Sequence, residues 1–325
     1  MSDDRIHDTV DAVLAGDLRA SARLMRDVDD NVSGARDVLR ALYPHTGGAR
    51  IIGVTGNPGC GKSTLVDALV ARYRHAGQRV GVVAVDPSSP FSGGAILGDR
   101  IRMQRHALDD GVFIRSLASR GHLGGLSRST GDVVVVLDAM GFDVILIETV
   151  GVGQAEVDIV EAAHLSIVVV VPGLGDEVQA IKAGVLEIAD VLCVNKADRD
   201  GAERTVRDLE MMVSLRPESG ARPPILCTVA VTGQGVEELQ AELDGRLDAS
   251  DSAAWEQRRL RQARRQVEDI LREEAAARLL SDAASEMEPL LLQVARRELD
   301  PYSLVDRILA RLPAPGASDI LGQSN

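Results

Sequence analysis

The sequence predicts an α/β fold, in which a mostly parallel central sheet is flanked by helices. Three observations support this. Short runs rich in β-branched residues alternate with stretches of helical spacing between residues 50 and 231. The longest apolar runs, such as Ile167–Val171, are typical of strands buried on both faces. Strands separated by helices indicate parallel pairing with right-handed crossovers. The seven runs are Ile51–Thr55, Val80–Val85, Val112–Ile114, Val144–Ile147, Ile167–Val171, Val191–Val194 and Ile225–Val229.

Helical patterns occupy both ends of the chain. Apolar residues at helical spacing over 5–43 predict two or three short helices, and Pro44–Gly48 ends that pattern. Val236–Leu247 closes the α/β unit as a helix, and 252–312 contains no β-type run. We therefore expect an N-terminal helical extension over 1–45, an α/β domain over 46–250 and a C-terminal helical arm over 251–325.

Composition narrows the class of protein. The net charge of −13 argues against a nucleic-acid binder, which normally has a basic surface. Three cysteines without metal-type spacing indicate reduced thiols in a cytoplasmic protein. The longest apolar runs are too short to span a bilayer, and the first residues lack the apolar segment of a signal peptide. We expect neither a nucleic-acid nor a membrane partner.

The use of lysine points to particular sites. The chain has 33 arginines but three lysines, which are Lys62, Lys182 and Lys196. A lysine ammonium is a compact point charge on a flexible stem, whereas a guanidinium is a wide planar fork. A chain that otherwise uses arginine keeps lysine where the fork would not serve. This pattern predicts a functional role for all three lysines.

The first lysine lies in a phosphate-binding motif. Residues 51–56 form a predicted strand and 63–73 a predicted helix, and between them stands the pattern Gly-x-x-x-x-Gly-Lys-Ser. The glycines let backbone amides surround phosphates, and the helix directs its positive end at them. Lys62 would reach the β- and γ-phosphates, and Ser63 would hold Mg²⁺. The predicted nucleotide contacts are Gly56, Asn57, Pro58, Gly59, Cys60, Gly61, Lys62, Ser63 and Thr64.

A second loop has the pattern of a guanine reader. Asn195-Lys196-Ala197-Asp198 ends a predicted strand. The Asp198 carboxylate can accept from the ring N–H and the exocyclic amine of guanine, and adenine offers no such pair. The Lys196 stem would lie over the base, and Asn195 would join this loop to the phosphate loop. After a later strand, the Ala230 amide could donate to guanine O6. The order of the two motifs predicts GTP rather than ATP.

Acidic residues after predicted strands suggest a magnesium site. Glu148 ends one buried strand, Asp86 ends another, and Asp99 follows a glycine-rich loop. Oxygen donors of this kind suit Mg²⁺. Gly151 could donate its amide to the γ-phosphate. For Asp86 and Asp99, helix capping or a solvated loop is the alternative. The catalytic candidates are Lys62, Glu148 and Asp86, and the metal candidates are Ser63, Asp86, Asp99 and Glu148.

Several motifs together resemble one family. They are Gly56–Ser63, Val85–Ser89, Gly93–Arg100, His122–Gly125, Glu148–Gln154 and Asn195–Asp198. Over roughly residues 40 to 245, these phrases resemble the MeaB/ArgK family of GTPases, the companions of adenosylcobalamin-dependent methylmalonyl-CoA mutase. The resemblance implies a P-loop NTPase G domain and a homodimer to which the C-terminal arm contributes. It also implies a chaperone that hydrolyses GTP to GDP, gates cofactor delivery to the mutase and releases damaged cofactor.

The resemblance also assigns individual residues. The family's metal ligands fall on Ser63, Asp86, Asp99 and Glu148. The segment that matches Gly173–Glu187 acts as an extra switch in the family, and Lys182 matches its lysine. Asp176 and Gln179 are the other switch candidates. The alternative for Lys182 is a solvated lysine loosely paired with a nearby acid.

Other functions fit parts of the pattern. A nickel-insertion GTPase would carry His- or Cys-rich metal sites at useful spacing, which the sequence lacks. A transport-linked ATPase or kinase conflicts with the guanine-type loop, and a nucleotide-binding scaffold without turnover is a further alternative. Isobutyryl-, ethylmalonyl- and 2-hydroxyisobutyryl-type mutases are alternative partners. No residue is placed by motif to orient the attacking water; Gln154 is a candidate only by its proximity to Gly151.

Overall fold

The protein is described here from a computed structural model. The residues that it describes are 3–86, 104–106, 108–118, 128–149, 162–173, 189–215, 222–249, 253–282 and 284–310. The chain divides into two compact units, Met1–Glu256 and Gln257–Asn325. Within those described ranges, no helix is both long enough and apolar enough to cross a membrane.

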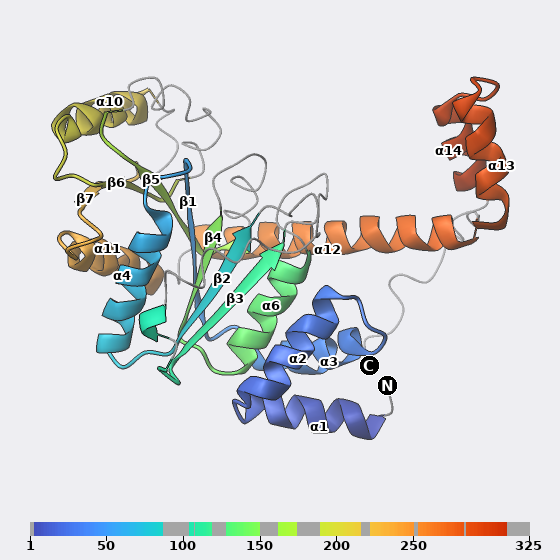
Figure 1. The fold of residues 1–325 in the computed structure, drawn as a ribbon, viewed down its shortest axis with the longest axis horizontal. Helices are drawn as coiled ribbons and strands as arrows, with labels where there is room; N and C mark the ends of the chain where they lie inside the picture. The colour runs from blue at the N-terminus through green and yellow to red at the C-terminus, as the bar shows by residue number, and fades with distance from the viewer. Residues whose placement is uncertain are drawn as a thin grey trace. The chain divides into compact units, whose positions relative to one another are not determined.

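A seven-stranded sheet, counted over the described residues, forms the centre of the first unit (Figure 1). Its strands are β1 (Arg50–Gly56), β2 (Val80–Asp86), β3 (Val112–Ala118), β4 (Val144–Thr149), β5 (Leu165–Val170), β6 (Val191–Asn195) and β7 (Ile225–Thr228). Each of the seven predicted runs forms one of them. The spatial order is β3-β2-β4-β1-β5-β6-β7, and every neighbouring pair is parallel. The predicted fold class is confirmed.

The strand order places β1 at a topological switch point. The chain leaves β1 toward β2 on one side, and it later returns past β4 to reach β5 on the other side. Loops at the carboxyl ends of strands around such a point diverge and leave a crevice, where open α/β sheets bind ligands. The glycine-rich loop follows β1 and therefore lies at this point.

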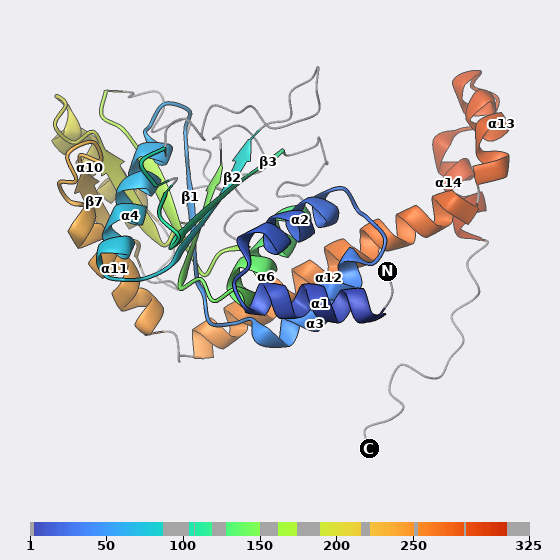
Figure 2. The ribbon, with the colours of Figure 1, turned by 60° about the horizontal axis from the view of Figure 1, so that its bottom comes forward.

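Helices cover both faces of the sheet (Figure 1 and Figure 2). The helices of the described residues are α1 (Asp3–Leu14), α2 (Leu18–Asp29), α3 (Ala35–Leu42), α4 (Lys62–His75), α6 (Arg128–Ala139), α10 (Ala202–Ser214) and α11 (Val236–Asp248) in the first unit, α12 (Ala253–Asp282), which begins there, and α13 (Ala284–Ala295) and α14 (Pro301–Leu309) in the second, with single turns η1 (Tyr43–His45) and η2 (Gln104–His106). Helices α4 and α11 pack on one face of the sheet. Helix α6, backed by α1–α3, packs on the other, where α10 covers β5 and β6.

Alternate strand residues supply the separate core layers. In β4, Val144 and Leu146 face α4, while Ile145 and Ile147 face α6, and all four are fully buried. Burial on both faces explains why this strand is a continuous apolar run rather than an alternating one.

The start of α12 is anchored in the first unit by an aromatic contact. Trp255 packs against the α4-side core, and its ring lies edge-on to His164 with centroids 6.4 Å apart. The His164 Nδ1 accepts a hydrogen bond from the Ile51 amide at 3.2 Å. Trp255 is the protein's one tryptophan.

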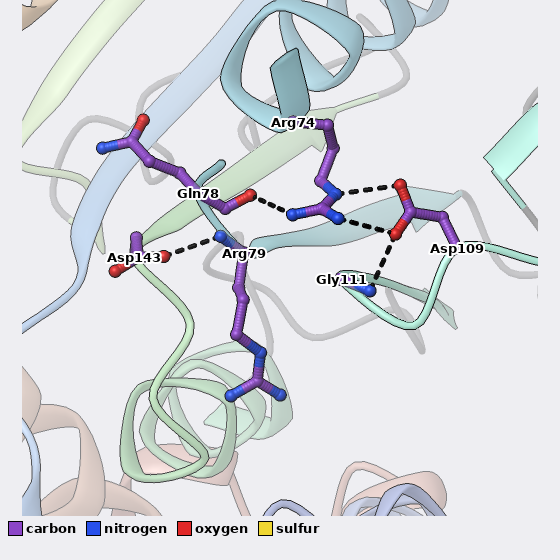
Figure 3. Close-up of polar contacts among 6 residues, drawn as sticks. All are labelled: Arg74, Gln78, Arg79, Asp109, Gly111 and Asp143. Atoms are coloured by element: carbon purple, nitrogen blue, oxygen red, sulfur yellow. Dashed lines mark hydrogen bonds and ion pairs between the residues drawn. The ribbon is translucent and has the colours of Figure 1, made fainter. Parts of the chain in front are cut away.

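The amino-terminal edge of the sheet is held by a guanidinium–carboxylate pair (Figure 3). At the end of α4, Arg74 donates through Nε and Nη2 to the two oxygens of Asp109 at 2.9 and 2.8 Å. Its Nη1 donates to the Gln78 carbonyl at 2.7 Å, and Asp109 also accepts from the Gly111 amide at 2.9 Å. The Arg74 hydrogen bonds, followed by that of Gly111, lower the pKa of Asp109. The pair fastens α4 to the turn that leads into β3.

A second arginine, Arg79, connects the segments that precede β2 and β4. The Arg79 amide donates to Asp143 Oδ2 at 2.6 Å (Figure 3), and the Arg79 Nη1 donates to the Met140 carbonyl at 2.7 Å. Its guanidinium lies 4.5 Å from the centre of the Phe142 ring, in a cation–π contact. This arginine therefore ties the segment before β2 to the segment before β4.

Arg74→Met, which keeps the stem and removes the fork, should lower the free energy of unfolding by about 1 kcal/mol. Because the pKa of Asp109 is lowered on folding, its contribution is complete above the unfolded value and is lost only as pH falls below it. The cost should thus be the same at about pH 5 and about pH 8, as measured by urea unfolding.

Arg40→Met is the matched control, because the Arg40–Asp37 pair on α3 is exposed on both sides. An exposed pair of this kind contributes little. Equal losses for the two variants would show that the Arg74 pair is an ordinary surface contact.

Candidate nucleotide-binding site

The loop between β1 and α4 requires glycine at two positions. Gly56 has φ +140°, and a Cβ there would collide with the Val169 carbonyl on β5. Gly61 has φ +91°, and a Cβ there would press on the Asn195 side chain. Positive φ and close approach both exclude a side chain. The glycines of the motif therefore let the loop lie tightly between β5 and the loop that follows β6.

The motif lysine curls back over this loop. Lys62 Nζ donates to the carbonyls of Gly56 at 2.6 Å and Asn57 at 3.0 Å. The side chain is only 5% exposed, although it begins a helix. Its ammonium therefore sits inside the loop, at the amino end of a 14-residue helix whose dipole adds positive potential. A phosphate oxygen is the natural ligand of this combination.

An oxygen pair lies beside the lysine. The Ser63 hydroxyl donates to Glu148 Oε1 at 2.6 Å, and both side chains are buried. Glu148 reaches this position because β4 pairs with β1 in a register that sets Val54 opposite Glu148. One residue further on, the Thr149 hydroxyl donates to the Thr55 hydroxyl at 3.1 Å. Two hard oxygen donors converge at the start of α4, and they fit the ligand preference of Mg²⁺.

The base-reading loop contacts the phosphate loop through two side chains. Asn195 Nδ2 donates to the Cys60 carbonyl at 2.9 Å, and Lys196 Nζ donates to the Gly59 carbonyl at 2.7 Å. Asn195 Oδ1 also accepts from the Ala230 amide at 3.1 Å. One asparagine therefore joins the ends of β1, β6 and β7, which are far apart in the sequence.

Of the predicted guanine contacts, Asp198 is exposed, whereas the Ala230 amide already has a hydrogen-bond partner within the protein. Asp198 is exposed, and its carboxylate makes no hydrogen bond or ion pair with any residue that the structure describes. The Ala230 amide, expected on guanine O6, donates to Asn195 instead. Its contact with the base therefore stays a prediction.

The remaining predicted residues are placed in part or lie outside the described residues. The backbone of Asp86 ends β2 next to β4, where Val85 pairs with Thr149. The candidates outside the described ranges are Asp99, Gly151, Gln154, Asp176, Gln179 and Lys182.

Sequence reasoning missed the side chain of Thr228. Its hydroxyl lies 3.2 Å from Asn195 Oδ1 and donates to it. The motif after this strand predicts a role only for the Ala230 amide. The available signal was a polar β-branched residue at the end of a buried strand, directly before that amide.

A buried lysine within a strand–loop–helix, with an acid on the adjacent strand, defines a P-loop nucleoside triphosphatase. A solved structure described as an LAO/AO transport system kinase has the same fold. It matches with a TM-score of 0.69 and 24% identity, over 95% of this chain and 98% of that one.

The family follows from sequence comparison. The model of the family described as methylmalonyl-CoA mutase-associated GTPase MeaB matches residues 22–286. A Pyrococcus horikoshii protein with a GTPase name is 47% identical over 312 residues, 94% of this chain and 98% of that protein. The mouse mitochondrial methylmalonic aciduria type A homolog is 37% identical over 193 residues, 58% of this chain and 46% of that protein. The chain belongs to the MeaB family and is a GTPase.

Proposed function

We propose that this GTPase is a chaperone for an adenosylcobalamin-dependent methylmalonyl-CoA mutase or a related acyl-CoA mutase. GTP binding and hydrolysis would gate cofactor loading and protect or reactivate the mutase. The family description supports the partner, because it associates these GTPases with methylmalonyl-CoA mutase. The main observation in support of GTP binding is the direct contact between the phosphate loop and the base-reading loop through Asn195.

The phosphate end is built for charge stabilisation. The Lys62 ammonium and the amides that open α4 would bind the β- and γ-phosphates and stabilise negative charge during phosphoryl transfer. Ser63 and Glu148 would hold Mg²⁺, with Asp86 and Asp99 as further candidates. When bound, that ion neutralises charge on the phosphate oxygens.

The base end is built for selectivity. Asp198 is an exposed carboxylate on a loop whose preceding residues are fixed to the phosphate loop. It would accept from the two guanine donors, and ATP would leave it without that pair. Lys196 would lie along the base, with Ala230 close to it.

The second unit supports the proposal of a homodimer through the 251–325 arm. Along α12, Leu260, Val267 and Leu271 are each about two thirds exposed in this single chain (65%, 64% and 64%). Large apolar side chains at helical spacing on an exposed face are typical of a surface that another helix covers.

Glu148→Ala should raise the Mg²⁺ concentration needed for half-maximal GTP hydrolysis and slow the reaction at saturating Mg²⁺. The effect should be at least about tenfold, because a charged oxygen donor beside the phosphates is lost. A Mg²⁺ titration of the GTPase rate measures both quantities. Glu242→Ala on α11 is the control and should leave the titration unchanged. An unchanged titration for Glu148→Ala would remove Glu148 from the metal site.

Asp198→Asn should weaken GTP binding by about a hundredfold, because two charge-assisted hydrogen bonds are lost. The amide should at the same time favour xanthosine triphosphate, whose extra carbonyl accepts from it. Calorimetry with GTP, ATP and XTP tests both expectations. Asp200→Asn, an exposed acid two residues further on, is the matched control and should keep GTP selectivity. Equal affinity of the unmodified protein for GTP and ATP would refute the assignment.

The proposed switch lysine should separate partner response from basal turnover. Lys182→Ala should hydrolyse GTP near the basal rate but lose stimulation by the cobalamin mutase of the source cell. Lys182→Arg should restore stimulation only partly, because the planar head is not a point charge. The GTPase rate is measured with and without the mutase. Stimulation of the alanine variant to the level of the unmodified protein would make Lys182 an ordinary surface residue. Absence of stimulation of the unmodified protein would contradict the chaperone proposal.

A further inference from the structure

Thr228 holds the base-reading loop at two points. It ends β7, is only 1% exposed, and lies opposite Asn195 in the parallel register. Its carbonyl accepts from the Ala197 amide at 3.0 Å, and its hydroxyl lies 3.2 Å from Asn195 Oδ1. One buried residue therefore fixes both the side chain that begins the loop and the backbone immediately before Asp198.

The direction of the hydrogen bonds around Thr228 follows from counting protons. An amide oxygen only accepts, so the Thr228 hydroxyl must donate to Asn195 Oδ1. The Cys193 thiol, 3.2 Å from the same hydroxyl, must then donate to it. Burial raises the pKa of Cys193 to about 12, and the thiol therefore stays protonated. Donation runs one way, from Cys193 to Thr228 to Asn195.

The groups around Asn195 favour one orientation of its side-chain amide. Oδ1 faces two donors, the Thr228 hydroxyl and the Ala230 amide, while Nδ2 faces the Cys60 carbonyl. A flipped amide would set Nδ2 against the Ala230 N–H and Oδ1 against the Cys60 carbonyl. The Ala230 amide and the Cys60 carbonyl both oppose that flip, and the Thr228 hydroxyl gives Oδ1 a second donor. Without this hydroxyl, the buried Oδ1 would lose one of its two donors, and Asn195 would be held less firmly.

We propose that Thr228 is a positioning residue for guanine selectivity, acting by orienting Asn195 and fixing the loop that carries Asp198. This inference rests on the proposed reading of guanine by Asp198. A carboxylate discriminates between bases only if its support holds it close to the productive geometry. Adenine lacks the two donors that the Asp198 carboxylate would accept from. Loss of the support should therefore affect GTP more than ATP.

The experiment compares three variants by calorimetry with GTP, ITP and ATP. Thr228→Val removes the hydroxyl at nearly constant shape and should weaken GTP about tenfold while ATP changes less than twofold. ITP lacks the exocyclic amine, so the difference between GTP and ITP should also shrink. Thr228→Ser keeps the hydroxyl, and its ratio of GTP affinity to ATP affinity should lie within about twofold of that of the unmodified protein.

Thr130→Val is the matched control. Thr130 on α6 is fully buried, and its hydroxyl makes no hydrogen bond with any residue that the structure describes. The same atomic change there should leave nucleotide selectivity and the Mg²⁺ titration unchanged. Thr228→Val should leave the Mg²⁺ titration unchanged as well, because its hydroxyl supports the base end.

If folded Thr228→Val keeps the ratio of GTP affinity to ATP affinity of the unmodified protein, the inference is wrong. The inference is also wrong if the affinities for both nucleotides fall by the same factor. In either case, a GTP preference in the unmodified protein and its switch in Asp198→Asn would still support guanine reading. If Thr228→Val does not fold, Cys193→Ala removes the donor to Thr228. It should lower the ratio by about threefold, and an unchanged ratio there would overturn the inference.

Discussion

The hydrogen bond from Asn195 to the Cys60 carbonyl is the contact on which the arrangement of this site depends. It crosses between two loops whose strands, β1 and β6, are separated in the sheet by β5. Gly61 must lack a side chain for the asparagine to approach this closely. The phosphate and base ends of a nucleotide would therefore meet surfaces that cannot move independently. Recognition of the base, if it occurs through Asp198 as proposed, would therefore depend on the position of the phosphate loop.

The two edges of the sheet are built for different tasks. At the amino-terminal edge, charged side chains neutralise one another, as Arg74 and Asp109 do, or pack on rings, as Arg79 does on Phe142. At the carboxyl-terminal edge, the buried Lys62 ammonium donates to the carbonyls of Gly56 and Asn57, and Asp198 is exposed. Charged side chains therefore join neighbouring segments at the amino-terminal edge, whereas those at the carboxyl-terminal edge lie where the proposed nucleotide would bind.

The sequence predicted the strands well because parallel strands buried on both faces need continuous runs of branched apolar residues. The phosphate loop could also be predicted from the sequence, because the local backbone geometry requires its glycines. The spatial order of the strands, with β1 between β4 and β5, was not predicted, because hydrophobic pattern does not encode neighbours. The role of the Thr228 side chain was not predicted for the same reason. Its hydrogen bond to Asn195 joins residues 33 positions apart in the sequence and forms only in one register of β6 and β7. Residues 174–188, which contain Lys182, lie outside the described part of the chain, and the roles predicted there remain predictions.

Trp255, the single tryptophan, lies at the beginning of a 30-residue helix and packs into the core of the first unit beside His164. The protein therefore carries a single indole fluorophore beside its three tyrosines, and the position of that indole is known. Near-ultraviolet emission will report the integrity of the first unit and the seating of the first turn of α12, with no tryptophan signal from residues 257 onward.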